Sequence, residues 1–377
     1  MFLTTGHLLS TTTFDLLAWP AITWICVRAI RTGDDRLWLL AGFVLGVALL
    51  NKPLPAFLAA GLLVGVAIAG PRRLLRSPWV WGGAAVALAL WAPWLVWQAD
   101  RGWPQLEVAE NITAGGSTSS EPRWALLPFQ FLLVSPLLAP VWLAGLYALL
   151  RDHRFRPYRF LAWAWIALAA AFLITGGKPY YLAGMFGVLL AAGAVVVDGW
   201  LDRGRSSARR WALGAAVVAS GAVSAVIALP LLPARDLDPV IAVNEDIGET
   251  VGWPELAETV AGVSERTGPA DRVTIFTANY GEAGALDRYG PALGLPRAYS
   301  GHNAYADWGT PRGHGPVIVV GYQDRGLVRR SFRDCRVEAA ISNDAGVEND
   351  EVGASVRLCE GPRRPWPELA DMLRHLG

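Results

Sequence analysis

Two lysines are the residues of this chain best suited to bind a phosphate. Lys and Arg together number 33, yet only Lys52 and Lys178 are lysines. Each lies in a short break between apolar stretches, Asn51-Lys52-Pro53 and Gly177-Lys178-Pro179. A lysine at the end of a membrane helix is a compact charge suited to the phosphate of a lipid-linked substrate. The alternative is coding bias toward arginine, with the two lysines left by chance.

Asp15 is the second candidate, because it lies inside an apolar run that begins at Thr11. A carboxylate within a membrane helix is costly and marks a functional candidate. The alternative is an interfacial Asp that reaches water or caps the helix after the threonines. The sequence leaves both interpretations open.

Glu107 is a third candidate, in the long connection from Gln98 to Arg123 that also carries Trp103. Acidic residues beside an aromatic side chain are a common sugar-binding combination. Acidic residues in such a connection are also often simply exposed to solvent. Glu107 is therefore either a sugar contact or a solvent-exposed residue without a binding role.

The elements that position these residues are predicted to be membrane helices. Hydrophobic residues make up 53% of the chain, and the mean hydropathy is +0.33. A crossing helix needs roughly 17 to 25 apolar residues. We expect a polytopic helical bundle of about eight transmembrane helices, from apolar runs at about 12–28, 37–50, 54–70, 78–97, 124–148, 159–175, 181–199 and 212–233.

The two shortest runs are interpreted as a hairpin. One kinked helix over 37–70 would be roughly 50 Å long, which exceeds a bilayer core of about 30 Å. Two helices of opposite direction also bring the arginine clusters to one side, which the positive-inside rule assigns to the cytoplasm. These arginines are Arg28, Arg31, Arg36, Arg72, Arg73, Arg76, Arg151, Arg154, Arg156, Arg159, Arg203, Arg205, Arg209 and Arg210.

The opposite side is then extracytoplasmic and carries both lysines, together with Arg101 and Arg123. Both ends of the chain are expected on that side. We predict a multi-pass protein of the plasma membrane whose C-terminal domain is extracytoplasmic.

Composition changes near residue 235, after which 22 of the 32 acidic residues occur. The sequence therefore predicts a transmembrane domain over 1–234 and a small soluble α/β domain over 235–377. The expected helices cover 254–266 and 282–289, and the expected strands cover 272–277, 317–322, 336–341 and 356–359.

Cysteine positions and missing motifs narrow the class further. Cys335 and Cys359 lie in the C-terminal domain and could form a disulfide in an oxidising compartment, whereas Cys26 lies in a predicted membrane helix. Two cysteines cannot make a structural zinc site, and we predict no metal site. The sequence contains no Walker loop, dinucleotide fingerprint, HExxH or nucleophile elbow. It also has no basic stripe for nucleic acid.

The order of three segments resembles the bacterial glycosyltransferase family 39, relatives of protein O-mannosyltransferases and aminoarabinose transferases. These segments are Ser10 to Trp19, Gly42 to Lys52 and Gly177 to Leu182, and the likeness runs over nearly all of the membrane part. The segment from Ser300 to Gly309 looks like one in the external domain of some members. The resemblance implies an inverting transferase of the GT-C architecture that takes a sugar from a polyprenyl-phosphate carrier.

The resemblance also implies roles for particular residues. Lys178 and Tyr181 would hold the lipid phosphate, with Asn51, Lys52 and Tyr180 as further substrate contacts, and a carboxylate would act as general base. The family's acidic first external loop has no counterpart before Thr11. We therefore expect an N-terminally shortened form whose own activity is open, with Asp15 as the catalytic candidate in this chain.

Two functional classes follow from these observations. The first is a membrane glycosyltransferase acting on a polyprenyl-phosphate-linked sugar, with a protein, glycan or lipid as acceptor. The second is a non-catalytic membrane protein that binds or transports a lipid-linked sugar, which would need polar residues along a passage through the bundle. No cofactor is predicted, and the presence of a divalent cation is left open.

Overall fold

The computed structural model describes residues 2–113, 122–204, 206–269 and 272–376. Arg205 of the predicted cytoplasmic cluster lies outside these ranges. The chain divides into two compact units, Met1–Leu229 and Pro230–Gly377. We call them the membrane unit and the C-terminal unit. The division falls five residues before the boundary expected from composition.

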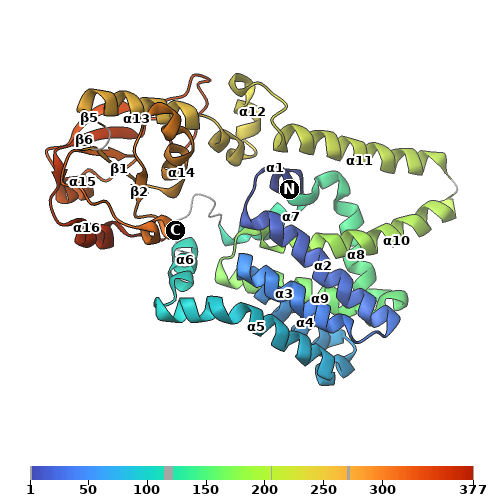
Figure 1. Ribbon diagram of the computed structural model, residues 1–377. Coiled ribbons are helices and arrows are strands. Elements are labelled where there is room, and N and C mark those ends of the chain that lie inside the picture. The colour runs from blue at the N-terminus through green and yellow to red at the C-terminus, as the bar shows by residue number, and fades with distance from the viewer. Residues whose placement is uncertain (1, 114–121, 205, 270–271, 377) are drawn as a thin grey trace. The chain divides into compact units, whose positions relative to one another are not determined.

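The membrane unit is helical throughout its regular elements (Figure 1). Its α-helices are α1 (Phe2–His7), α2 (Thr11–Thr32), α3 (Leu37–Asn51), α4 (Leu54–Ala69), α5 (Pro78–Asp100), α6 (Pro104–Thr113), α7 (Leu126–Val134), α8 (Ala139–Arg151), α9 (Arg159–Thr175), α10 (Phe186–Gly204) and α11 (Ser207–Ala228). Short 3-10 turns connect several of them: η1 (Arg72–Arg76), η2 (Arg123–Ala125), η3 (Pro136–Leu138), η4 (His153–Tyr158) and η5 (Pro179–Met185).

Several of these helices can cross a membrane, which supports a multi-pass protein. Within the described residues, five are long and apolar enough, and a sixth is added if α7 and α8, bent by 88°, form one span. Helices α3 and α4 have only 15 and 16 residues, or roughly 22 to 24 Å. The expected number of eight crossings therefore stays a prediction.

The contacts between α3 and α5 indicate that α3 and α4 run in opposite directions. A Cβ at Gly83 would collide with the carbonyl of Trp38, and one at Gly46 would reach Leu90, so α3 and α5 run parallel. Because α4 must lead from the end of α3 back to the start of α5, it runs the other way. The helix-pair interpretation of residues 37–70 agrees with this geometry, with the break at Lys52.

The core of the membrane unit joins residues of α2, α4, α9 and η5. Trp19 of α2, Leu58 of α4, Phe172 of α9 and Leu182 of η5 are at most 2% exposed. Their burial fixes η5 against α2 and α9, because closely packed interiors leave little freedom to shift. The turn that carries Lys178 is therefore held on a rigid base.

The C-terminal unit is a small α/β domain, as predicted. Its five-stranded sheet has the order β2-β1-β3-β6-β5. β1 pairs in parallel with β2 and β3, whereas β6 pairs antiparallel with β3 and β5. The strands are β1 (Thr274–Thr277), β2 (Ala298–Ser300), β3 (Val317–Val320), β5 (Arg336–Ala340) and β6 (Ser355–Cys359), with a separate pair β4 (Phe332–Arg333) and β7 (Gly361–Pro362).

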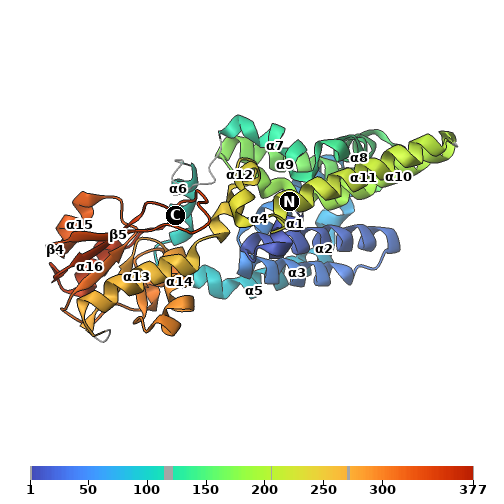
Figure 2. The ribbon, with the colours of Figure 1, turned by 90° about the horizontal axis from the view of Figure 1, so that it is seen from above.

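Helices cover both faces of this sheet (Figure 2). α13 (Trp253–Thr267) and α14 (Tyr280–Tyr289) pack on the face of Ile275 and Ile318, and α15 (Arg325–Ser331) and α16 (Trp366–Leu373) on the face of Phe276 and Val319. Successive strand residues point to opposite faces, so alternation sorts them into two cores. The remaining elements are α12 (Asp238–Ile241), η6 (Ala234–Asp236), η7 (Glu245–Thr250), η9 (Gly290–Leu293) and η10 (Asn303–Trp308).

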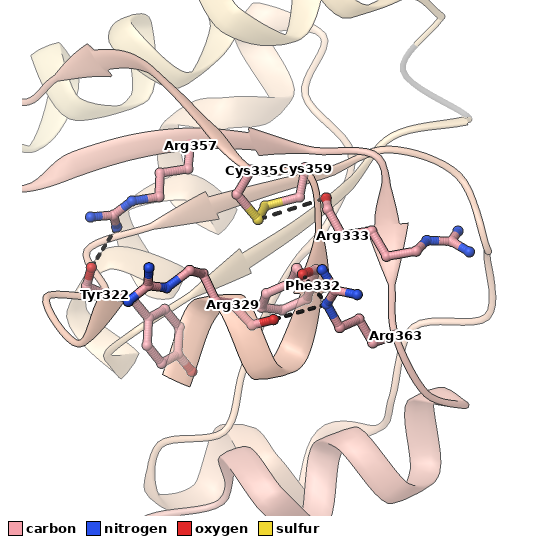
Figure 3. Close-up of a disulfide and its surroundings, with 8 residues drawn as sticks. All are labelled: Tyr322, Arg329, Phe332, Arg333, Cys335, Arg357, Cys359 and Arg363. Atoms are coloured by element: carbon pink, nitrogen blue, oxygen red, sulfur yellow. Dashed lines mark hydrogen bonds between the residues drawn. A yellow bond between two sulfur atoms is a disulfide. The ribbon is translucent and has the colours of Figure 1, made fainter. Parts of the chain in front are cut away.

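Cys335 and Cys359 form a disulfide, with an S–S distance of 2.02 Å (Figure 3). Cys335 precedes β5 and Cys359 ends β6, so the bond joins neighbouring strands of the sheet. Cys26 is buried and free in α2. This is the disulfide that the sequence suggested for Cys335 and Cys359.

Candidate functional site

The start of α2 places Asp15 in the interior of the membrane unit. Ser10 is the N-cap residue, and its hydroxyl accepts from the backbone N–H of Thr12 while Thr13 Oγ1 accepts from Ser10 N–H. These bonds satisfy the free donors at the helix start. Asp15 is therefore not needed as a cap, and it is buried, with 4% of its surface exposed.

The carboxylate of Asp15 has unused hydrogen-bonding capacity. Among the described residues, neither of its oxygens has a hydrogen-bond partner. A buried polar group without a partner costs roughly 1 to 3 kcal/mol, and more when it is charged. The nearest compensation is electrostatic, since the carboxylate attracts the ammonium of Lys52.

Lys52 lies where α3 ends and α4 begins. Its backbone is extended, and its N–H bonds to Ala48 O at 3.1 Å as the last bond of α3. Pro53 follows, and proline cannot donate the bond that would continue the helix. The chain therefore turns at Lys52, which is partly buried and no longer follows the helical path of α3.

The second lysine lies in the turn between α9 and η5. Gly176 ends α9 in the left-handed region, at φ 74° and ψ 34°, which favours glycine. Lys178 then precedes Pro179 in extended backbone, and its carbonyl accepts from Tyr181 N–H at 3.0 Å. Lys178 is buried, with only 9% of the residue's surface exposed.

These separate segments converge on one another. The Lys52 Nζ lies 5.5 Å from the ring centre of Tyr180 and 5.2 Å from that of Tyr181. A cation over an aromatic face is attracted by the ring quadrupole. Asn51 Nδ2 also donates to Thr11 O at 2.9 Å, which ties the end of α3 to the start of α2.

An aromatic layer supports the two tyrosines. Tyr180 and Tyr181 meet edge to face at 5.2 Å, and Tyr181 meets Phe172 in the same way at 5.4 Å. Phe57 of α4 lies 5.4 Å from Phe172. Such pairs add to the burial of the rings, so the faces beneath Lys52 are fixed by packing from α4 and α9.

We define the lysine cluster as Asp15, Asn51, Lys52, Lys178, Tyr180 and Tyr181. The structure brings Asp15, Asn51, Lys52, Tyr180 and Tyr181 together through the contacts above, and Lys178 lies in the same turn as the tyrosines. An anionic group with a hydroxyl neighbour could bind here, between cations and a buried carboxylate. Within the described residues, no group of three or more His, Cys, Asp or Glu side chains could hold a metal ion.

Glu107 lies outside these contacts. It is an exposed residue of α6. The end of α6 lies near the turn that carries Lys178, since a Cβ at Gly176 would be 3.7 Å from Thr113 Cγ2. Six residues of helix, or roughly 9 Å, separate Thr113 from Glu107. The role of Glu107 as a sugar contact therefore stays a prediction.

Gln130 contacts the turn that carries Lys178 and was not among the candidates from the sequence. It is 1% exposed in α7, and its Nε2 donates to Pro179 O at 2.9 Å and to Leu126 O at 2.6 Å. The amide thus binds the residue that follows Lys178. A lone amide in the apolar run 126–134 is the signal that could have identified it, as a lone carboxylate identified Asp15.

Comparison with known proteins adds one family match. Residues 1–97 match the sequence model of a family described as dolichyl-phosphate-mannose-protein mannosyltransferase. The matched range contains Asp15 and Lys52 but ends before Gln130 and Lys178. Neither the curated proteins nor the solved structures gave a match.

The family match and the apolar helices together support a multi-pass membrane protein with similarity to membrane glycosyltransferases of the GT-C type. The resemblance noted over nearly the whole membrane part is thus supported at family level over residues 1–97.

Proposed function

We propose that this protein is a membrane glycosyltransferase that moves a sugar from a polyprenyl-phosphate carrier to an acceptor hydroxyl on the extracytoplasmic side. The observation that carries the proposal is the convergence of Asp15 and Lys52 with Tyr180 and Tyr181 from a distant part of the chain. The family match over the first two of these residues supports the same reaction class.

Lys52 and Lys178 are suited to the carrier phosphate. When the sugar leaves, negative charge grows on the phosphate oxygens, and fixed cations in a water-poor site stabilise that charge. The rings of Tyr180 and Tyr181 orient the Lys52 ammonium without neutralising it, because they offer no carboxylate. Asp15 also attracts this ammonium, and the carrier phosphate is its second anionic partner in the proposal.

Asp15 is suited to the acceptor. Its buried oxygens have no hydrogen-bond donor among the described residues, so an acceptor hydroxyl can supply one. General-base catalysis by a positioned carboxylate contributes about 10² to 10⁴ in rate. The ionised carboxylate is the form that can accept a proton, and the Lys52 ammonium attracts that form.

The proposed reaction balances without a cofactor. The acceptor oxygen attacks the anomeric carbon of the sugar and gives its proton to Asp15. The bond between that carbon and the phosphate oxygen breaks, and its electron pair leaves with the polyprenyl phosphate. The anomeric centre inverts, because attack and departure occur on opposite faces.

The test is a transfer assay with the full chain in lipid vesicles. Polyprenyl phosphate carrying labelled mannose, the sugar in the matched family's description, is mixed with a cell-envelope fraction as acceptor. We expect label to move from the lipid to the envelope material. Asp15→Asn should lower the transfer rate by about 10² or more while donor binding remains.

Asp198→Asn is the matched control, because Asp198 is an exposed carboxylate of α10 that takes no part in the lysine cluster. Its rate should equal that of the wild type. Donor binding without transfer by the wild-type protein, or an Asp15→Asn variant with normal transfer, would contradict the proposal.

A further inference from the structure

We infer that Gln130 is a positioning residue that holds the Lys178 turn in the form that binds the donor phosphate. The inference rests on the proposed function and adds a residue to it. Gln130 lies 48 residues before Lys178 in the sequence, on α7, and α7 packs against η5. It contacts the turn rather than the substrate.

The hydrogen bonds fix which end of the amide faces the turn. Two carbonyl oxygens, those of Pro179 and Leu126, lie within 2.9 Å of one Gln130 atom. Only the amino group can face two acceptors, because the amide oxygen has no proton to donate. The amino group therefore joins the backbone of α7 to the backbone of the lysine turn.

The other end of the amide shows that Gln130 is more than a space-filling residue. Its Oε1 is buried and has no hydrogen-bond partner among the described residues. A leucine or methionine would fill similar space without an unpaired oxygen, and unpaired polar atoms are costly in an apolar interior. The amide is thus a poor choice for packing alone and a good choice for holding the Pro179 carbonyl.

A second side chain holds the other end of the same turn. The Arg123 guanidinium donates to Ile174 O at 3.0 Å, near the last residues of α9. Between the two anchored carbonyls lie Gly176 and Gly177, which have little side-chain packing of their own. Arg123 therefore anchors the backbone before Lys178, and Gln130 anchors the backbone after it.

The test compares binding of polyprenyl phosphate to the full chain in lipid nanodiscs. Gln130→Met keeps the length of the side chain and removes both hydrogen bonds. We expect its dissociation constant to rise about tenfold, the effect of one lost hydrogen bond to the turn. Gln130→Glu has the same shape but lacks the amino donor, and it should weaken binding at least as much.

Thr23→Val is the matched control. Thr23 is 2% exposed, and its hydroxyl donates to two carbonyls, Trp19 O and Pro20 O, within its own helix. The Thr23→Val variant should bind polyprenyl phosphate with the same dissociation constant as the wild type. The control separates loss of a buried hydrogen-bonding group in general from loss of this one.

A double-mutant cycle tests whether Gln130 acts through Lys178. If it does, Gln130→Met should cause no further loss of affinity when Lys178→Ala is already present. Hydrogen exchange gives a second measure, since the Tyr181 amide bonds to Lys178 O within the turn. The peptide over 176–185 should exchange faster in Gln130→Met, while peptides from α5 and α11 stay unchanged.

The outcomes separate this inference from the proposed function. Wild-type protein that fails to bind polyprenyl phosphate contradicts the proposed function. Wild-type binding together with normal binding by Gln130→Met overturns only the role of Gln130, as does an additive loss in the double mutant. Unchanged exchange over 176–185 also overturns it, and this measurement applies even if affinity falls through partial misfolding.

Discussion

At the scale of single residues, Asp15 and Lys52 form a pair that stability alone does not favour. A buried carboxylate without hydrogen bonds is costly, and one ammonium over two aromatic rings compensates only in part. Proteins retain such groups where they act on a ligand. The pair is therefore a candidate functional site, and the proposed substrate chemistry would account for it.

Residue type alone identified Asp15, Lys52 and Lys178, because charges in apolar runs are rare. Their contacts could not be predicted in the same way. Lys52 and Tyr181 are 129 positions apart, and only the packing of α2 and α4 on η5 and α9 brings them together. Whether Asp15 capped its helix was also undecided until the structure assigned that role to Ser10 and Thr13.

A second buried carboxyl group, Glu282, gives a pH prediction for the C-terminal unit. Burial raises the pKa of Glu282 well above its usual value, and the neighbouring Glu351 raises it further. The folded state thus prefers the protonated form. Stability from this group is full at acidic pH and is lost as the pH rises through the raised pKa.

Glu282→Gln should remove that loss, because the amide is neutral at every pH and can still accept from Asn279 N–H as Glu282 does now. Calorimetric unfolding at a series of pH values checks this. The variant should gain melting temperature over the wild type toward alkaline pH, whereas the exposed Glu258→Gln should not. If the melting temperatures of the wild type and Glu282→Gln changed with pH in parallel, Glu282 would not titrate in this way.

At the scale of elements, close helix contacts set the position of the Lys52 break. Helix α3 approaches α5 so closely that a Cβ at Gly42 or Gly83 would collide with the facing backbone. Small residues allow such approach in membrane bundles. The end of α3, and with it Lys52, depends on this contact.

Gly83→Ala should therefore destabilise the membrane unit by about 1 to 3 kcal/mol, the usual cost of overpacking. Thermal unfolding in detergent measures the change. Gly214→Ala is the control, because a Cβ there meets nothing within 4 Å in α11. It should be neutral or slightly stabilising, and equal melting temperatures for the two variants would show that the α3–α5 contact tolerates a methyl group.

Element types were more predictable than their limits or partners. Helices near 254–266 and 282–289 were expected and occur as α13 and α14, and all four expected strands occur as β1, β3, β5 and β6. The three-residue strand β2 and the short helix α15 are too brief to show a clear period. Among the membrane helices, α3 and α4 are shorter than a usual span, so hydropathy alone could not settle the number of crossings.

At the scale of the whole molecule, sidedness links the arginines to the lysine cluster. The arginine clusters lie in the connections at the opposite ends of the helices from Lys52 and Lys178. The positive-inside rule then assigns the lysine cluster to the extracytoplasmic side. The match to residues 1–97 supports the class of enzyme, and this orientation is our proposal.

Single cysteines test the orientation. In a chain with Cys26→Ala, a membrane-impermeant maleimide should label Glu107→Cys in intact cells and should label Arg73→Cys only after permeabilisation. Both positions are exposed in the structure. The reverse pattern would place the lysine cluster in the cytoplasm and contradict the proposed side of transfer.

The most direct measurement of the central claim is photo-crosslinking of the full chain with polyprenyl phosphate that carries a reactive group beside the phosphate. The account predicts adducts at residues 51–53 and 177–181, which excess polyprenyl phosphate prevents and Lys52→Gln with Lys178→Ala removes. Adducts confined to the C-terminal unit or to the connection between α10 and α11 would contradict it.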